Sequence, residues 1–181
     1  MDLAEIFRRE GPVEVDLGCG DGTFLAALAE RFPERNFLGI ERLLGRVRSA
    51  CGKAARGGLR NVRVLRVETS YAVEFLLPPR SVEIIHLLFP DPWPKKRHHR
   101  RRVVTESFLA AVHRVLAANG RLRIATDQED YFQSIREIIS PDFFTGKEIE
   151  SASSDFPLTT FEKHFLARGA PIYRLELGKV S

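Results

Sequence analysis

The chain has 181 residues, of which 44% are hydrophobic and 29% charged, a balance typical of a globular protein and not of a disordered one. No apolar run approaches the roughly 18 residues that a membrane span needs, and two cysteines, Cys19 and Cys51, form neither a disulfide framework nor a Cys-x-x-Cys zinc motif. Composition therefore disfavours secreted, membrane and zinc-binding proteins. It predicts a cytoplasmic protein with one domain over residues 1–181 and no metal.

Charge is distributed unevenly along the chain, although the formal net charge is only +4. Residues 95–102, KKRHHRRR, carry six Lys/Arg, residues 42–67 carry eight, and neither segment contains an acid. Residues 1–41 carry nine acids and four bases. A concentrated basic run favours a polyanionic partner, and a solvated charged face is the plain alternative.

Short β-branched runs alternate with amphipathic stretches. The pattern predicts strands over 13–17, 36–40, 62–67, 82–89, 121–126, 143–149 and 172–177, and helices over 22–31, 45–56, 72–77, 103–116 and 128–139. Asn119-Gly120 is expected to form a turn, and 151–160 a Ser-rich loop. Five strand–helix units in series predict an α/β fold with a doubly wound, mostly parallel, seven-stranded sheet. Ligands of such sheets bind at the carboxyl ends of the strands.

A glycine turn, Asp16-Leu-Gly18-Cys-Gly20-Asp-Gly22, follows the first predicted strand. Alternate glycines permit a sharp turn and let a ligand approach the backbone, and the next helix begins with free N–H groups. The dinucleotide fingerprint places a third glycine at position 23, where this chain has Thr23. The turn is therefore a candidate nucleoside site, although such a turn alone is weak support for a cofactor.

Acidic residues also end the second and third predicted strands. Glu41 can accept hydrogen bonds from both ribose hydroxyls of a nucleoside, and Glu68 can accept one from an adenine amino group. A first-turn acid of a helix is the plain alternative for Glu41, and a surface turn residue for Glu68. Together with Asp16, these acids at three consecutive strand ends favour an adenosyl cofactor.

The fourth predicted strand runs into FPDPWPKKRHHRRR. Its three prolines favour a stiff, extended loop that holds Asp91 at the mouth of the site. Trp93 follows and could stack on a base or form a wall of the pocket. The basic run offers phosphate contacts, and its two histidines lack the spacing of metal ligands.

Five motifs in order give the chain from Pro12 onward a resemblance to the bacterial tRNA (guanine-N7)-methyltransferase family. They are DLGCGDG (16–22), FLGIE (37–41), FPDPWPKKRHHRRR (89–102), ATD (125–127) and TTFE (159–162). The resemblance implies the Rossmann-like class I methyltransferase fold and S-adenosylmethionine as cofactor. It also implies methyl transfer to N7 of a guanine in the tRNA variable loop, position 46 in the tRNA convention.

By matching motifs, the resemblance implies a role for each candidate residue. Cofactor contacts are expected from Asp16, Gly18, Gly20, Glu41, Glu68 and Asp91, and Asp91 is also the expected catalytic acid. Target-base or tRNA contacts are expected from Lys95, Asp127 and the segment Thr159 to Glu162, and further RNA contacts from Lys96, Arg97, His98, Arg100, Arg101 and Arg102. The expected partner is tRNA, and the expected assembly is a monomer or homodimer. Family members usually carry a longer, often basic segment before the first strand, where this sequence has only residues 1–12. This departure concerns tRNA affinity and not the chemistry.

Three other functions are compatible with parts of the pattern. An amino-group methyltransferase is the first, because Asp91-Pro-Trp93 is similar to the Asp-Pro-Pro-Trp loop of adenine-N6 enzymes. The second is an RNA-binding module that lost catalysis, which would have no need of acids at three strand ends. The third and weakest is an NAD oxidoreductase, which lacks the third fingerprint glycine.

Overall fold

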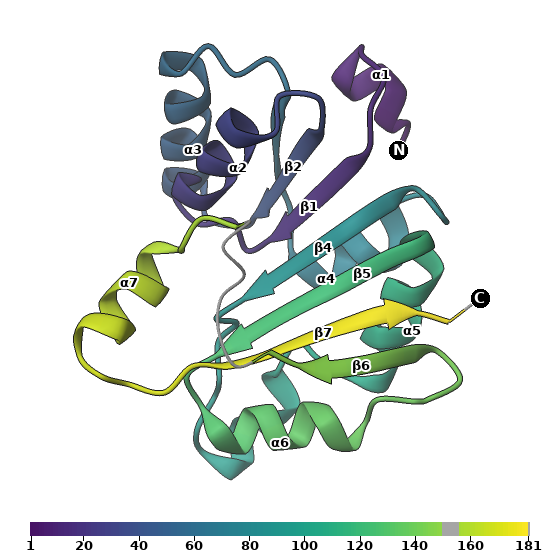
Figure 1. Ribbon diagram of the computed structural model, residues 1–181, viewed down its shortest axis with the longest axis vertical. Coiled ribbons are helices and arrows are strands. Elements are labelled where there is room, and N and C mark those ends of the chain that lie inside the picture. The colour runs from purple at the N-terminus through teal and green to yellow at the C-terminus, as the bar shows by residue number, and fades with distance from the viewer. Residues whose placement is uncertain (150–155, 181) are drawn as a thin grey trace.

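The computed structural model describes residues 1–149 and 156–180, and in these ranges seven strands form one sheet (Figure 1). The strands are β1 (Val13–Leu17), β2 (Asn36–Glu41), β3 (Val62–Arg66), β4 (Val82–Leu88), β5 (Leu116–Thr126), β6 (Phe144–Glu148) and β7 (Tyr173–Lys179). Their order is β3-β2-β1-β4-β5-β7-β6. Strands β1 to β5 are parallel, and β7 runs antiparallel to both β5 and β6. The predicted mostly parallel α/β sheet is confirmed.

Helices connect the strands and cover the sheet. They are α1 (Leu3–Phe7), α2 (Thr23–Arg31), α3 (Leu44–Arg56), α4 (Thr69–Tyr71), the π-helical η1 (Ala72–Leu76), the 3₁₀-helical η2 (Lys96–Arg101), α5 (Glu106–Val115), α6 (Glu129–Glu137) and α7 (Thr160–Ala167). No helix in the described ranges is both long and apolar enough to span a bilayer.

The structure differs from the sequence-based elements both in their boundaries and in their number. The helix expected over 103–116 begins at Glu106, because the Thr105 hydroxyl accepts a hydrogen bond from Phe108 N (3.1 Å) and caps it. The turn expected at Asn119-Gly120 lies inside β5, whose pairing with β4 shifts register there. Helices α1 and α7 were not predicted.

The core lies on both faces of the sheet. All five residues of β1 are buried, as expected for a strand covered on both faces. Phe24, Leu25 and Leu28 of α2 belong to the smaller apolar cluster, and Phe108 and Val112 of α5 belong to the larger one. Each such side chain stabilises the fold by about 1.5–3 kcal/mol relative to its exposed state.

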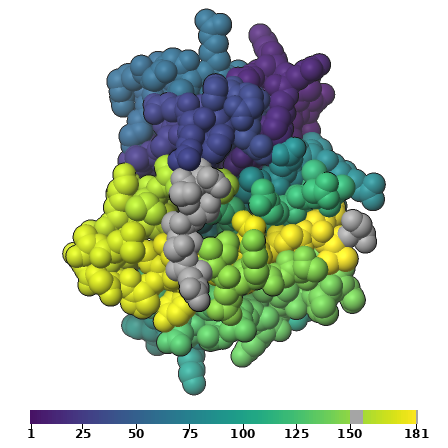
Figure 2. Space-filling view, viewed as in Figure 1, coloured from purple at the N-terminus to yellow at the C-terminus, as the bar shows by residue number. Residues whose placement is uncertain are grey.

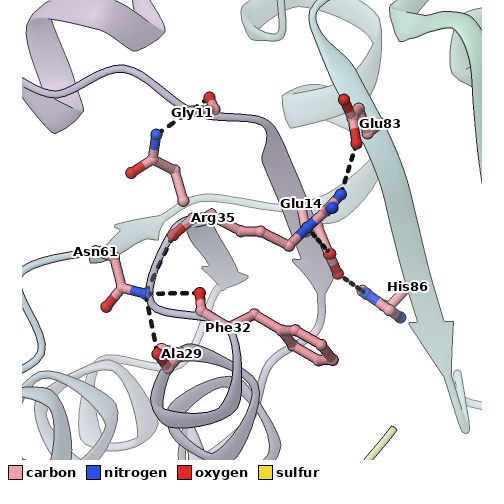
Figure 3. Close-up of polar contacts among 9 residues, drawn as sticks. Gly11, Glu14, Ala29, Phe32, Arg35, Asn61, Glu83 and His86 are labelled. Carbon is pink, nitrogen blue, oxygen red and sulfur yellow. Dashed lines mark hydrogen bonds and ion pairs between the residues drawn. The ribbon is translucent and has the colours of Figure 1, made fainter. Parts of the chain in front are cut away.

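A buried polar network joins β1 to β4 (Figure 3). Glu14 of β1 is only 2% exposed, and its carboxylate lies 2.5 Å from Arg35 Nε and 2.8 Å from His86 Nε2. Arg35 also contacts Glu83 of β4, with 2.6 Å between Nη2 and Oε2. Burial lowers the pKa of His86 against the opposing effect of Glu14, so the ring is neutral at pH 7. Arg35 therefore supplies the positive charge that compensates buried Glu14.

Candidate active site

A cleft of about 660 Å³ lies at the carboxyl ends of the central strands. Its lining comes from the loops after β1, β2, β3 and β4 and from the start of α7. In Figure 1, α7 lies beyond the arrowheads of β4 and β5. The strand order reverses between β1 and β4, which is where doubly wound sheets bind their ligands. The volume suits a ligand of nucleoside size.

The glycine turn after β1 forms the floor of the cleft. Gly18 and Gly20 have φ angles of 79° and 57°, in the left-handed region that favours glycine. A Cβ at Gly18 would meet no atom within 4 Å, and one at Gly20 would meet only the Gly18 carbonyl oxygen at 4.0 Å. The missing side chains therefore leave space in which a ligand can approach the backbone.

Glu41 and Glu68 both line the cleft, and both also stabilise the helix that follows them. Glu41 Oε1 accepts a hydrogen bond from Leu43 N (2.8 Å), and Arg46 Nη1 lies 3.8 Å from Oε2. Glu68 Oε2 accepts one from Tyr71 N (2.9 Å). The ligand-binding interpretation and the helix-end interpretation are thus compatible, because one carboxylate can serve both.

Asp16 lies at the base of the cleft and is 4% exposed. Burial, reinforced by the negative charge of Glu41, raises the pKa of Asp16 to about 7. The carboxyl is therefore poised to ionise near neutral pH. A cationic ligand in the cleft favours its ionised form.

Asp91 also lines the cleft, and it lies on the loop after β4, which β1 separates in the sheet from β2 and β3 and their strand-end acids. Two residues near it, Phe89 and Trp93, have φ angles of 54° and 44°, which is uncommon for residues other than glycine. Left-handed backbone at bulky residues costs on the order of 1–3 kcal/mol and is concentrated at functional loops. The three prolines expected to stiffen this loop are in place, and no regular secondary structure forms over 89–95.

The basic run after this loop forms η2, which the sequence did not predict. Lys96, Arg97 and Arg100 are exposed on its surface. Arg101 lines the cleft, with its guanidinium 4.9 Å from the centre of the Trp93 ring. The run therefore borders the cleft.

The expectation that Arg102 contacts RNA needs correction. Arg102 is 8% exposed, and its guanidinium donates hydrogen bonds to Asp130 Oδ2 (2.5 Å), Ser134 Oγ (3.0 Å) and the Pro92 carbonyl (2.9 Å). It also lies over the Tyr131 ring, 4.5 Å from the centroid. Arg102 thus fastens the Asp91 loop to α6, and each of its three guanidinium nitrogens donates a hydrogen bond within the protein.

Glu162 differs from expectation in a similar way. Its Oε2 accepts a hydrogen bond from Thr159 N (2.8 Å), while Thr159 Oγ1 accepts one from Glu162 N (3.0 Å), which makes a capping box for α7. Arg174 Nη2 lies 3.2 Å from the other carboxylate oxygen. Thr159 lines the cleft, but Glu162 is buried behind it.

The remaining expected residues lie outside the cleft lining. Lys95 is exposed just before η2, where its carbonyl accepts a hydrogen bond from His98 N (2.7 Å). Asp127 follows β5 and accepts a hydrogen bond from Gln128 Nε2 (2.6 Å). Over 1–149 and 156–180, no group of three or more His, Cys, Asp and Glu side chains could hold a metal ion.

Phe161 also lines the cleft, and it lies inside the 159–162 segment expected to contact the target base or tRNA. Its only sequence signal is an aromatic inside the TTFE motif, directly after a helix-capping threonine. The lining also includes Arg42, Thr69 and Phe89, each within a few residues of a strand end.

Comparison with known proteins places the chain in a family. A family model described as "Putative methyltransferase" matches residues 10–175. A tRNA (guanine-N(7)-)-methyltransferase of Aeromonas hydrophila is 36% identical over 93% of this chain and 74% of its own length. A protein of the same name from Thermotoga maritima is 34% identical over 99% of this chain, which spans 58% of that relative.

Solved structures show the same fold at lower identity. A SAM-dependent O-methyltransferase from Thermotoga maritima is 17% identical, with a TM-score of 0.66 over 99% of this chain and 63% of its own. A SAM-dependent methyltransferase from Aquifex aeolicus is 19% identical, with a TM-score of 0.62 over 98% of this chain and 86% of its own. The fold is therefore that of the S-adenosylmethionine-dependent methyltransferases. Together with the sequence matches, this shows that the chain belongs to the tRNA (guanine-N7)-methyltransferase family.

Proposed function

We propose that this protein transfers a methyl group from S-adenosylmethionine to N7 of a guanine in the tRNA variable loop, position 46 in the tRNA convention. One observation carries the proposal: a single cleft is lined by the glycine turn and strand-end acids on one side and by Asp91 and α7 on the other. The first side suits a nucleoside cofactor, and the second suits an incoming base. The names of the relatives support tRNA as the substrate.

The residues present fit the cofactor. Gly18 and Gly20 leave open space where a side chain would otherwise stand, and the cleft volume suits an adenosyl compound. Glu41 would accept the ribose hydroxyls, and Glu68 the adenine amino group. Asp16 would lie near the cationic part of the ligand. When bound, S-adenosylmethionine supplies a methyl group already activated by its sulfonium sulfur.

The guanine needs positioning more than activation. N7 carries an in-plane lone pair and no proton, so no general base has to act before the attack. The protein contributes by holding N7 in line with the methyl group at near-attack distance. The purine becomes cationic as the bond forms, and the Asp91 carboxylate stabilises that developing charge. An ionised acid at the cleft mouth can also accept guanine N1–H and the exocyclic amine.

The test of this function is nucleoside analysis of tRNA after incubation with the protein and methyl-labelled S-adenosylmethionine. We expect label in 7-methylguanosine, and loss of that label when the variable-loop guanine is replaced by adenine. Label in an amino-methylated purine would contradict the proposal, as would binding of tRNA without any transfer.

Replacing Glu41 by alanine is expected to weaken S-adenosylmethionine binding by about 1–3 kcal/mol, because two ribose hydroxyls lose a charged acceptor in a partly buried site. Isothermal titration calorimetry measures the change. Glu41→Gln keeps an acceptor for Leu43 N, so it separates the ribose contact from the support of α3. An alanine variant that stays folded and binds the cofactor like wild type would remove Glu41 from the ribose role.

The ionisation of Asp16 gives cofactor binding a pH dependence. The pKa of Asp16 is about 7 in the free protein, and a cationic ligand favours the ionised carboxylate. At lower pH, ligand binding is therefore accompanied by loss of the proton from the Asp16 carboxyl. Affinity should therefore rise between about pH 6 and pH 8 and level off above that range. Titrations in buffers of different ionisation enthalpy would detect the released proton. Asp16→Asn should flatten the profile, and an unchanged slope in that variant would assign the titration to another group.

A further inference from the structure

The glycine turn at the floor of the cleft is built from residues with little rigidity of their own. Gly18, Gly20 and Gly22 all have left-handed φ angles, of 79°, 57° and 77°. Glycine loses more conformational freedom on ordering than any other residue, so a turn with three glycines keeps one shape only if other contacts hold it. The shape of the floor therefore depends on the elements packed around the turn.

The two ends of the turn are held by different elements. At its beginning, Gly18 N and Cys19 N both donate hydrogen bonds to the Ile40 carbonyl of β2, at 2.8 and 3.0 Å. At its end the neighbour is α3, because a Cβ on Gly22 would lie only 2.6 Å from Ala50 Cβ. In the space-filling view, the dark blue of α2 meets the lighter blue of α3 in the upper part of the molecule (Figure 2). Helix α3 therefore packs directly on the backbone of the turn.

Lys53, one helical turn after Ala50 on α3, makes three contacts with the end of the glycine turn. Its Nζ donates hydrogen bonds to the Asp21 carbonyl oxygen (3.0 Å) and to the Thr23 hydroxyl (2.8 Å), and it pairs with the Asp21 carboxylate. The other Asp21 carboxylate oxygen accepts hydrogen bonds from Thr23 N (3.1 Å) and Thr23 Oγ1 (2.9 Å). One ammonium group thus ties together the two residues that flank Gly22.

The position of Lys53 distinguishes it from a ligand-binding residue. Asp21 and Thr23 line the cleft, whereas Lys53 approaches them from α3 and is not part of the lining. Partial burial raises the pKa of Asp21, but hydrogen bonds from Lys53 and Thr23 outweigh that effect and lower the pKa below its usual value. Asp21 is therefore a carboxylate at neutral pH, and its hydrogen bond with Lys53 joins two charged groups, which makes it stronger than a neutral one.

We propose that Lys53 is a positioning residue for the cofactor, an inference that rests on the cofactor half of the proposed function. Through Asp21 and Thr23, Lys53 holds the glycine turn in its open shape before the cofactor arrives. A ligand that meets a preformed floor does not have to order three glycines as it binds, so the preformed turn raises the affinity. Because Lys53 lies outside the cleft lining, it affects cofactor binding and leaves the methyl-transfer step itself unchanged.

The first test uses the free protein. Lys53→Met keeps the apolar stem of the side chain and removes its charge. Hydrogen exchange should become about 10-fold faster at Gly22 N, which donates to the Cys19 carbonyl within the turn (3.0 Å). Exchange should not change at Phe37 N, which donates to the Asn61 carbonyl between β2 and the residue before β3 (2.8 Å). An equal acceleration at both amides would mean that Lys53 only stabilises the fold, and no acceleration at Gly22 would mean that it does not hold the turn.

The second test measures cofactor binding and turnover separately. Lys53→Met should weaken S-adenosylmethionine binding by about 5- to 20-fold in calorimetry, while the single-turnover rate at saturating cofactor should stay within about twofold of wild type. Lys53→Arg keeps the charge and should recover most of the affinity. Arg56→Met is the matched control, because it removes another cation from the last turn of α3. Wild-type affinity in Lys53→Met, or an equal loss in Arg56→Met, would overturn the assignment.

A double-mutant cycle shows whether Lys53 acts through Asp21. Asp21→Asn removes the charge with which Lys53 pairs, so adding Lys53→Met to that variant should weaken cofactor binding by less than about threefold. The full loss in the Asp21→Asn background would refute a role that acts through this carboxylate. If the wild-type protein itself binds no S-adenosylmethionine, the proposed function fails, and the exchange experiment still decides whether Lys53 holds the turn.

Discussion

Asp91→Asn should lower the single-turnover rate of methyl transfer by about 100-fold or more, with near-normal binding of tRNA and cofactor. Asparagine keeps the shape of the side chain and removes the charge that stabilises the cationic purine. Asp91 is exposed at the cleft, so the substitution leaves the core intact. Rapid-quench assays at saturating substrates would measure the effect, because they isolate the chemical step from binding.

Two matched aspartates sharpen this experiment. Asp142→Asn lies in the exposed turn before β6 and should behave like wild type. Asp127→Asn removes an acid that follows β5 outside the cleft lining, and we expect a smaller loss than at Asp91. If Asp127→Asn instead gives the larger loss, the electrostatic role passes to Asp127. Asp91 would then be a structural residue of its proline-rich loop.

The second large effect concerns tRNA affinity. Replacing Lys96, Arg97 and Arg100 together by alanine should weaken tRNA binding and reduce its salt slope by about two to three units, because each phosphate contact releases nearly one counterion. S-adenosylmethionine affinity should stay at the wild-type value. Filter binding across a salt series would measure both quantities. Arg102 is left intact, because its bonds to Asp130 and Pro92 hold the loop.

The control for that triple variant removes the same charge elsewhere. Arg48, Arg56 and Arg60 are exposed on and after α3, in the second basic stretch of the sequence. Their alanine triple variant should retain more of the affinity and of the salt slope. If it loses more than the η2 variant, the RNA docks along α3, and η2 is a solvated surface helix.

The sequence predicted the sheet and the gathering of the strand-end acids at one cleft, for a physical reason. Buried parallel strands are short β-branched runs, and their carboxyl ends share one edge, so the positions of Asp16, Glu41 and Glu68 along the chain also place them in space. Local pattern was enough because each acid follows its own strand directly.

The arrangement of the other cleft residues could not be predicted in this way, because it depends on contacts between segments that are distant in the sequence. In the sequence, Arg102 is one more cation of a basic run. Its side chain is buried because it pairs with Asp130 of α6, which is distant in the sequence. Thr159 and Glu162 match a family motif and also the T-x-x-E capping signature, which would have predicted α7 from the sequence. The free surface of Phe161 follows from the packing of Phe89 and Phe165, and no local pattern encodes that packing.

The Glu14–Arg35–His86 network has a consequence for the geometry of the reaction. Within the sheet, β1 to β3 carry the groups proposed to bind the cofactor, and the elements from β4 onward carry Asp91 and Phe161. The pairing of β1 with β4 joins these two halves. In the proposed function, the methyl donor and the acceptor would therefore be held by separate halves, and the pairing of β1 with β4 sets the distance between these halves. Sliding of β1 against β4 is resisted because it would break two contacts at once, the buried hydrogen bond between Glu14 and His86 and the ion pair between Arg35 and Glu83. Donor–acceptor distance is thus fixed from beneath the cleft, by residues that never touch a substrate.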